Sequence, residues 1–403
     1  MLQLNNPAAL NSLDIEMVSF LNDILPTFTS SPSTGTQSQQ LLSSKADASP
    51  PSAIRATIFI ANQEKRKVFC AGGNMKRIYL AGMGLSTQTP DIQAFQAKHH
   101  GYGFPGLETS DFFREEYQMN YKIALQLMEN KMPQISIWDG IVMGGGVGLS
   151  IHGKYRVATQ HTMFAFPETN IGFFPDVGAS HVLPKLNGGI GNYIALTGAR
   201  LYADDLMYAG LATHYVPSEN VDGMLQRIVE ESVKDSGEVG ETNFVAGLLM
   251  SHHEELDSQE KCFLEKNREQ IDEAFEGKQS VEDIMIVLEE SNTEFARDTL
   301  DILRKMSPTS LKVTLESMIR GKRLNDIGEC LKMEYRIGQM IIRKGSDFYE
   351  GVRAVLVDKD RNPNWSPTRL EDVTETMVAS YFEELGGNEL VLEGSDSIHS
   401  PKL

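Results

Sequence analysis

The residues of this sequence best suited to chemistry are two carboxylates, Glu168 and Asp176. They stand eight positions apart in FAFPETNIGFFPDVGASHVLPKL (164–186), each next to a proline and among phenylalanines. A carboxylate in such apolar surroundings is partly desolvated, which raises its pKa and suits it to proton transfer. The same pattern fits two loop carboxylates that cap neighbouring helices, since Asp is common at helix N-caps. The spacing alone leaves both interpretations open.

Two glycine clusters form a second set of candidates. FCAGGNMKRIY (69–79) and DGIVMGGGVGLS (139–150) each place glycines after an apolar stretch and before a helical one. A backbone N–H at such a turn can stabilise a developing oxyanion, because no side chain blocks the approach and the helix N-terminus adds a partial positive charge. We predict that Gly73 and Gly145 supply the two donors of an oxyanion hole. Taken singly, either cluster also fits a tight turn that allows close packing.

Other kinds of site find less support. The triple glycine lacks the third glycine of the G-x-G-x-x-G motif, and GLSIHGKY (148–155) ends in tyrosine where a P-loop needs serine or threonine. Cys70 lies in an apolar run, which favours packing over reactivity. Three scattered histidines have no G-x-S-x-G serine to serve: His152, His161 and His181. No cluster of His, Cys or carboxylates suggests a metal, and we expect neither a metal nor a cofactor.

The composition limits the class of protein. The chain has 403 residues, 41% of them hydrophobic, and a formal net charge of −18. These values indicate a soluble protein with room for a core domain and a smaller region, and they argue against a direct nucleic-acid binder, which needs a basic face. Three widely spaced cysteines fit a reducing compartment. No apolar run approaches the roughly 18 residues of a membrane span.

Apolar, strand-like runs alternate with helical stretches through the first half of the chain. The runs begin near residues 54, 134, 155, 162 and 211, and the helical stretches cover 13–25, 112–130 and the segment that opens at Gly145. This alternation predicts parallel sheet with crossover helices. A Ser-, Gln- and Pro-rich segment at about 29–52 is too polar to pack, and we expect a disordered surface insertion there.

Beyond about residue 220 the pattern becomes charged and helical. Leu311, Leu315 and Met318 share one helical face, and Pro308 after Ser307 marks the start of that helix. We therefore expect an α/β core at 1–220, a mainly helical region at 221–385 and a flexible tail at 386–403.

In their order along the chain, these segments resemble the crotonase (enoyl-CoA hydratase/isomerase) superfamily. Further matching stretches are NNPAALNSLDIEM, FFREEY, ALTGARL, MSPTSLKVTL, MEYRIGQ and DFYEGVRAVLVDKDRNPNW, and together they reach from residue 4 to about 365. The resemblance implies an α/β fold in which repeated ββα units form a spiral, followed by the helical region. It also implies an acyl-CoA thioester substrate, whose carbonyl oxygen would lie between the N–H groups of Gly73 and Gly145. CoA is then part of the substrate and not a cofactor.

Within the superfamily, the carboxylates resemble those of the branch that hydrolyses 3-hydroxyisobutyryl-CoA. Hydratases carry a glutamate where this chain has Gly148, and usually a glycine where it has Asp176. The resemblance implies that Glu168 and Asp176 are the catalytic pair and that Glu116 of FFREEY joins the substrate site. Glu168 would act as a nucleophile or as the base for a water. Asp176 would orient the water or the hydroxyacyl group and manage the proton of the departing thiol.

Three residues near Gly73 carry further expectations. Lys76 and Arg77 follow this glycine and would contact the CoA phosphates, although an exposed basic pair also fits plain solvated surface. Asn74 stands where the superfamily usually has Asp. Asn can replace Asp if the residue only hydrogen-bonds the loop, whereas activity falls if the charge matters.

The resemblance implies hydrolysis of 3-hydroxyisobutyryl-CoA in valine breakdown, with 3-hydroxypropionyl-CoA as a second substrate. Two alternatives stay open: a non-catalytic component of the mitochondrial small ribosomal subunit, as some similar proteins are, and an enoyl-CoA hydratase or isomerase, against which Gly148 argues. A homo-oligomer is compatible with the superfamily.

The resemblance also bears on the compartment. It implies a mitochondrial location, and the final PKL suggests the peroxisome because it resembles the S-K-L address. The chain begins inside what should be an early strand, so we expect a preceding hairpin and any targeting peptide to be missing.

Overall fold

The computed structural model describes residues 1–25, 56–62, 67–84, 107–128, 133–234, 243–256 and 260–393. The insertion expected at about 29–52 and the C-terminal PKL lie outside these ranges.

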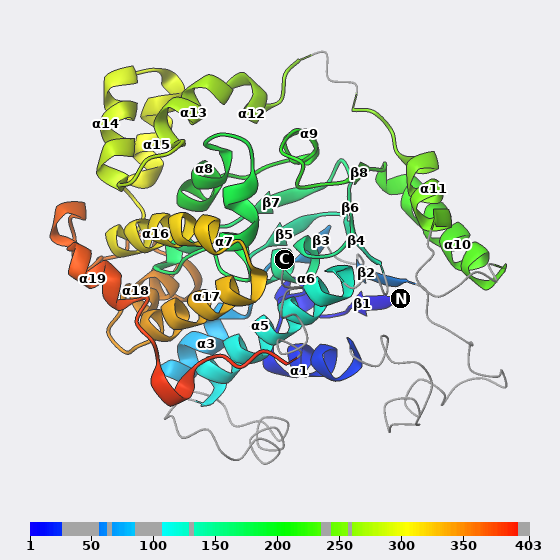
Figure 1. Cartoon of the computed structure of the whole chain (residues 1–403), viewed down its shortest axis with the longest axis horizontal. Helices are drawn as coiled ribbons and strands as arrows, with labels where there is room; N and C mark the ends of the chain where they lie inside the picture. The colour runs from blue at the N-terminus through cyan, green and yellow to red at the C-terminus, as the bar shows by residue number, and fades with distance from the viewer. Residues whose placement is uncertain are drawn as a thin grey trace, which may run out of the picture.

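Two parallel sheets lie at the centre of the described structure (Figure 1). The larger sheet has the order β1 (Leu2–Leu4), β2 (Thr57–Ala61), β4 (Gln134–Trp138), β6 (Tyr155–Ala158) and β8 (His214–Tyr215). The smaller sheet has the order β3 (Val68–Cys70), β5 (Ile141–Met143) and β7 (Met163–Ala165). Neighbouring strands run parallel throughout both sheets.

Consecutive strands go to different sheets, which makes the core a spiral. β2, β4 and β6 join the larger sheet, and the strand that follows each of them joins the smaller one. Helices then return the chain for the next pair: α3 (Met75–Gly82) follows β3, and α6 (Gly145–Ile151) follows β5. The predicted spiral of ββα units is therefore confirmed. Each strand pair also ends at the same edge, which brings the two glycine clusters together.

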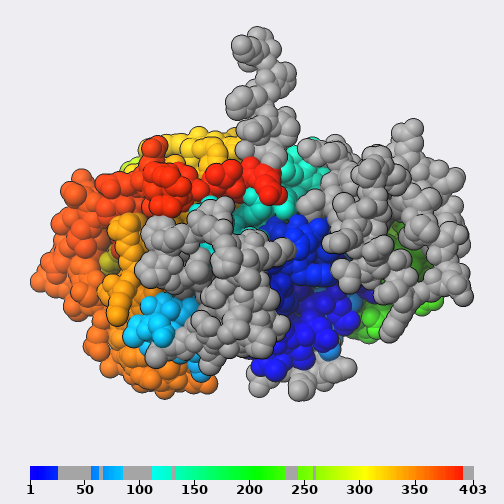
Figure 2. All heavy atoms as spheres, turned by 90° about the horizontal axis from the view of Figure 1, so that it is seen from below, coloured from blue at the N-terminus to red at the C-terminus, as the bar shows by residue number. Residues whose placement is uncertain are grey.

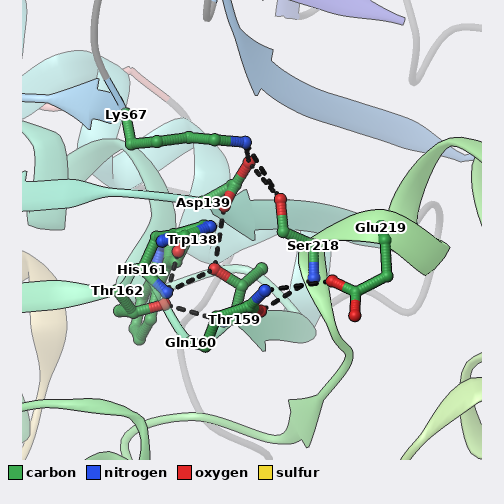
Figure 3. Close-up of polar contacts among 9 residues, drawn as sticks. All are labelled: Lys67, Trp138, Asp139, Thr159, Gln160, His161, Thr162, Ser218 and Glu219. Carbon is green, nitrogen blue, oxygen red and sulfur yellow. Dashed lines mark hydrogen bonds and ion pairs between the residues drawn. The ribbon is translucent and has the colours of Figure 1, made fainter.

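A buried carboxylate fixes the step between the two sheets. Asp139 follows β4, and its Oδ1 accepts a hydrogen bond of 2.9 Å from Thr159 Oγ1, at the next step of the spiral. Its Oδ2 accepts from Lys67 Nζ at 2.6 Å and from Ser218 Oγ at 2.9 Å (Figure 3). Because Lys67 precedes β3 and Ser218 opens α10, the cluster joins three turns of the spiral to the helical region. Its role is architectural.

Two helices, α1 (Ile15–Ile24) and α5 (Leu107–Met128), pack against each other on the N-terminal side of the core. α1 begins at Asp14, whose side chain accepts from Met17 N. These helices correspond to those predicted at 13–25 and 112–130. In the space-filling view the blue N-terminal segment shares one face with α3 and with the orange C-terminal elements (Figure 2).

The described elements beyond β8 are helices. The α-helices among them are α10 (Ser218–Lys234), α11 (Asn243–His252), α12 (Phe263–Lys266), α13 (Arg268–Phe275), α14 (Val281–Ser291), α15 (Glu294–Leu303), α16 (Pro308–Leu324), α17 (Ile327–Ile341), α18 (Asp347–Val352) and α19 (Glu375–Ser380). Side chains of α10 and α11 form a hydrophobic cluster with the larger sheet, whereas α17 packs on α5. Among the described residues, no helix has both the length and the apolar character needed to cross a bilayer.

The start of α16 confirms a detail read from the sequence. Ser307 caps the helix by accepting from Ser310 N, Pro308 occupies the first turn, and Leu311, Leu315 and Met318 are buried. The division of the chain near residue 220 stays a prediction, because one hydrophobic cluster extends from the N-terminal strand to the last described residues. Leu390 and Leu392, within the expected tail, are 2% and 3% exposed and pack on this core.

Candidate active site

The two glycine clusters meet as predicted. Leu13 and Gly73 form an isolated parallel β-bridge. In this bridge Leu13 N donates to Gly72 O, and Leu13 O accepts from Asn74 N. The N–H of Gly73 takes no part in the bridge and therefore points away from Leu13. A Cβ placed on Gly145 would lie 3.1 Å from Gly73 N. Gly145 is the first residue of α6, where N–H groups have no intrahelical partner. The two N–H groups thus lie side by side at the N-terminus of a helix.

Only glycine suits the start of α6. Gly144 has φ 47° and ψ −121°, a conformation that a side chain disfavours strongly. A Cβ at Gly144 would also lie 2.8 Å from Glu168 Oε1, and a Cβ at Gly145 would lie 2.3 Å from Glu116 Oε1. The missing side chains therefore leave room for two carboxylates beside the N–H donors.

Three carboxylates from separate elements gather at this point. Glu116 comes from α5, Glu168 opens the short 3-10 helix Glu168–Ile171, and Asp176 lies in the loop that follows. They are 1%, 6% and 4% exposed. Within the described part of the chain, Glu116 Oε1 and Glu168 Oε2 have no hydrogen-bond partner. Since buried polar atoms are normally paired, these two oxygens mark a place where a ligand is expected.

Burial and mutual repulsion set the charge of this cluster. Burial, and next the Asp176 charge, raise the pKa of Glu168 well above its usual range. The pKa of Glu116 is raised in the same way, by burial first and then by its two acidic neighbours. Burial raises the pKa of Asp176 to about 7, while the hydrogen bond from Tyr117 opposes this rise. Raised pKa values of this kind suit the three carboxyl groups to proton transfer, as acid–base catalysis requires.

The loop that carries Asp176 is strained and strongly supported. Tyr117 Oη donates to Asp176 Oδ2 at 2.7 Å. The next residue, Val177, is β-branched yet has φ 56°, a conformation that costs about 1–3 kcal/mol and persists only when its surroundings enforce it. Its carbonyl lies 2.7 Å from Nε2 of the buried His152. Burial lowers the pKa of His152 to about 4, so this imidazole is neutral and donates Nε2–H to the carbonyl.

A carboxylate from the C-terminal region completes the support of the loop. Glu334 of α17 is fully buried and accepts hydrogen bonds from Gly178 N at 2.7 Å, Ser180 N at 2.9 Å and Ser180 Oγ at 2.6 Å. Burial raises the pKa of Glu334 to about 8, against the effect of these donors. The loop that positions Asp176 is thus held by α5, α6 and α17 at once.

The residues after Gly73 fall into different environments. Arg77 forms a two-point ion pair with Glu16, with both N–O distances at 2.8 Å, whereas Lys76 is exposed. A contact of either with CoA phosphates stays a prediction, and the ion pair makes Lys76 the freer candidate. Asn74 caps α3, because its Oδ1 accepts from Arg77 N at 3.2 Å. A neutral amide can make this hydrogen bond, which agrees with the expectation that Asn replaces Asp here if the residue only hydrogen-bonds the loop.

The remaining candidates behave as packing residues. Cys70 is fully buried, and burial raises the pKa of its thiol to about 12, so it is no thiolate nucleophile. His161 and His181 are not among the partners of the three carboxylates. Among the described residues, no group of three His, Cys, Asp or Glu side chains is arranged to hold a metal ion.

Sequence reasoning missed Tyr117, Asn120 and Glu334. Tyr117 and Asn120 follow Glu116 at one and four positions on α5, so the FFREEY motif, extended as a helix, would have pointed to both. Glu334 gave a weaker signal, a glutamate between apolar positions of a helical pattern.

Comparison with known proteins agrees with this geometry. The family model described as enoyl-CoA hydratase/isomerase matches residues 1–382. The chain is 37% identical over 390 residues to the mitochondrial 3-hydroxyisobutyryl-CoA hydrolase of Dictyostelium discoideum, covering 96% of this chain and 89% of that protein. It is 39% identical over 326 residues to the human protein of the same name, covering 80% and 76%.

Solved structures support the fold. A carnitinyl-CoA dehydratase from Mycobacterium thermoresistibile superposes with a TM-score of 0.77 at 31% identity, covering 97% of this chain and 95% of that one. An enoyl-CoA hydratase from Rhodobacter sphaeroides 2.4.1 gives 0.71 at 29% identity, covering 97% and 96%. The chain therefore belongs to the enoyl-CoA hydratase/isomerase family, and within it to the branch of the 3-hydroxyisobutyryl-CoA hydrolases.

Proposed function

We propose that this protein hydrolyses the thioester of 3-hydroxyisobutyryl-CoA to the free hydroxy acid and CoA, a step of valine breakdown. The observation that carries the proposal is the pair Glu168 and Asp176, buried with raised pKa values beside the two N–H donors of Gly73 and Gly145. The curated relatives named for this reaction support it. 3-Hydroxypropionyl-CoA, which lacks one methyl group, is proposed as a second substrate.

In the proposed mechanism, the thioester oxygen accepts hydrogen bonds from Gly73 N and Gly145 N. Glu168 acts in its ionised form, which protonation of Asp176 favours because it removes the neighbouring negative charge. Either this carboxylate attacks the carbonyl carbon, or it removes a proton from a water that attacks. The negative charge that develops on the oxygen is stabilised by the two donors, each worth on the order of 10²–10³ in rate. The C–S bond then breaks, and the departing thiolate takes a proton from Asp176, whose pKa of about 7 lets it carry one near neutral pH.

The two routes differ in their product at Glu168. Direct attack forms an anhydride between the acyl group and Glu168, which water then hydrolyses. Turnover in ¹⁸O-labelled water places label in the Glu168 carboxylate when water attacks the glutamyl carbonyl of that anhydride. On the general-base route the side chain stays unlabelled.

A hydratase reaction fits this site poorly. A Cβ at Gly148 would lie 2.5 Å from Val177 Cβ and 2.9 Å from Asn120 Nδ2. The glutamate that hydratases carry at this place therefore has no room beside the strained loop. A scaffold role would not need three buried carboxylates with raised pKa values around an oxyanion hole, and we do not propose one.

The test is release of CoA, followed with a thiol reagent, from 3-hydroxyisobutyryl-CoA, beside hydration of crotonyl-CoA. We expect CoA release without hydration, and loss of that release in Glu168→Gln. Glu273→Gln is the matched control, since Glu273 is exposed on α13. Hydration of crotonyl-CoA, or CoA release that survives Glu168→Gln, would contradict the proposal.

The setting of the reaction is proposed from the relatives. Both hydrolases above are named mitochondrial, which supports the same location for this chain. Independence of metals and other cofactors, and assembly into a homo-oligomer, remain predictions from the sequence.

A further inference from the structure

One buried amide beside the carboxylates is unsatisfied. Asn120 lies on α5 and is 0% exposed. Within the described part of the chain, neither its Oδ1 nor its Nδ2 has a hydrogen-bond partner. Buried amides are nearly always paired, so an amide with both ends unpaired needs an explanation beyond packing.

The surroundings of Asn120 place it in the active site. It stands four residues after Glu116, so the two side chains share one face of α5, roughly 5–6 Å apart. On the facing helix, Glu116 lies against Gly145 and Asn120 lies against Gly148, at 2.9 Å from a Cβ placed there. Because residues three apart share a helix face, the amide lies about one turn, roughly 5 Å, beyond the oxyanion donor Gly145.

An acidic and an apolar side chain stand beside Asn120. Glu116, on the same face of α5, has its Oε1 unpaired within the described residues. On the other side stands Val177, next to Asp176. A group that accepts a hydrogen bond from Asn120 Nδ2 and donates one to a carboxylate oxygen would satisfy these two atoms. A neutral hydroxyl does both, whereas an alkyl group does neither and a further anion would be repelled.

We propose that Asn120 binds the 3-hydroxyl group of the acyl chain and so selects 3-hydroxyacyl thioesters over unsubstituted ones. This inference rests on the proposed function. With the carbonyl oxygen at Gly73 and Gly145, C3 of the acyl chain lies two bonds beyond the carbonyl carbon, toward Gly148. There the hydroxyl oxygen accepts from Asn120 Nδ2, and its proton is donated to Glu116 Oε1.

The experiment compares two thioesters of the same carbon skeleton, 3-hydroxyisobutyryl-CoA and isobutyryl-CoA. The readout is the ratio of their kcat/KM values for CoA release. A site built to bind a hydroxyl discriminates strongly against the analogue that lacks it, so the unmodified protein should prefer the hydroxy substrate. In Asn120→Leu, similar in size but without polar atoms, we expect kcat/KM for the hydroxy substrate to fall about 10- to 100-fold. The value for isobutyryl-CoA should stay within about twofold, so the ratio collapses.

A matched control lies on the same helix. Gln126 is buried on α5, and its Nε2 donates to Leu25 O in the segment of α1, away from Gly148. Gln126→Leu should leave the ratio unchanged. Asn120→Ala serves as the second variant, because the smaller alanine side chain fits the site even if leucine prevents folding. Melting temperatures of all three variants identify any that is unfolded.

Each outcome decides the inference. Equal slowing of both substrates in the Asn120 variants would assign the residue to a catalytic water or to structure and overturn the proposal. Equal turnover of both thioesters by the unmodified protein would overturn it too. If the unmodified protein releases CoA from neither thioester, the proposed function fails as well. If it hydrolyses the hydroxy substrate and the ratio survives in the variants, only the role of Asn120 is wrong.

Discussion

Tyr117 of α5 donates a hydrogen bond of 2.7 Å to Oδ2 of Asp176, which lies 59 residues further along the chain. Both residues are buried, and this bond lowers the pKa of Asp176 against the larger effect of burial. The hydrogen bond thus keeps the pKa of Asp176 near 7, where the group can both give and take a proton at neutral pH.

Removal of the Tyr117 hydroxyl should move the pH profile of the reaction. In Tyr117→Phe the pKa of Asp176 rises, because a donor to the ionised form is lost. We expect the limb of the kcat profile that reports Asp176 to shift to higher pH. Tyr193→Phe is the control, since Tyr193 is also buried but packs against Phe263, Phe275 and Phe295. An unshifted pH profile in Tyr117→Phe would mean that this hydrogen bond does not set the ionisation that controls catalysis.

Glu334 should support both stability and rate, although it touches no reacting atom in the proposed mechanism. Glu334→Gln presents an amide NH₂ to N–H and O–H donors, so at least one of the three bonds to Gly178 and Ser180 is lost. The expected cost is about 1–3 kcal/mol of unfolding free energy. We also expect kcat to fall more than KM rises, because the loop that positions Asp176 loosens.

The control for Glu334 lies on the same helix. Glu329 is exposed and pairs with Lys332, and Glu329→Gln should change unfolding free energy by less than about 0.5 kcal/mol. Denaturant unfolding and steady-state kinetics measure both effects. If the Glu334→Gln variant is destabilised but fully active, Glu334 contributes to the stability of the fold and not to the reaction.

A methyl group at Gly145 should abolish most activity. The added Cβ would lie 2.3 Å from Glu116 Oε1 and 3.1 Å from Gly73 N, within the approach to both oxyanion donors. We expect kcat of Gly145→Ala to fall by about 10²–10³. Gly223→Ala is the control, because a Cβ at this position of α10 meets nothing within 4 Å. That change should keep activity and add up to about 1 kcal/mol of stability. Near-normal turnover by Gly145→Ala would place the oxyanion hole elsewhere.

The buried carboxylates should make the protein less stable at alkaline pH. The pKa of Asp176 is raised to about 7 in the folded protein from an ordinary value of 3.8, so folding favours its protonated form. This contribution is present below pH 3.8 and is lost as pH rises through 7, because the folded state binds the extra proton. Asp176→Asn removes that dependence.

We therefore expect the gain in melting temperature of Asp176→Asn over the unmodified protein to be larger at pH 8.5 than at pH 5. Differential scanning calorimetry at both values measures it. Asp283→Asn is the control, as Asp283 is on the first turn of α14, outside the cluster. A pH-independent difference would mean that Asp176 ionises freely in the folded protein.

The sequence alone determined the local elements and the types of the reacting groups. Apolar runs and helical periodicity are properties of neighbouring residues, so β2, β4, β6 and the start of α16 followed from short segments. The sequence also pointed to the reacting groups, because a glycine at a strand end can expose its backbone N–H and a carboxylate among phenylalanines is desolvated. These residues are Gly73, Gly145, Glu168 and Asp176. The family resemblance added Glu116.

Only the tertiary structure decided which of these residues meet and what supports them. The approach of Gly145 to Gly73, the hydrogen bond from Tyr117 to Asp176 and the capping of the loop by Glu334 join segments far apart in the chain. Such contacts depend on how the sheets and helices pack, and no local pattern encodes them. For the same reason, the strain at Val177, the pairing of Arg77 with Glu16 and the unsatisfied amide of Asn120 appear only in the folded chain.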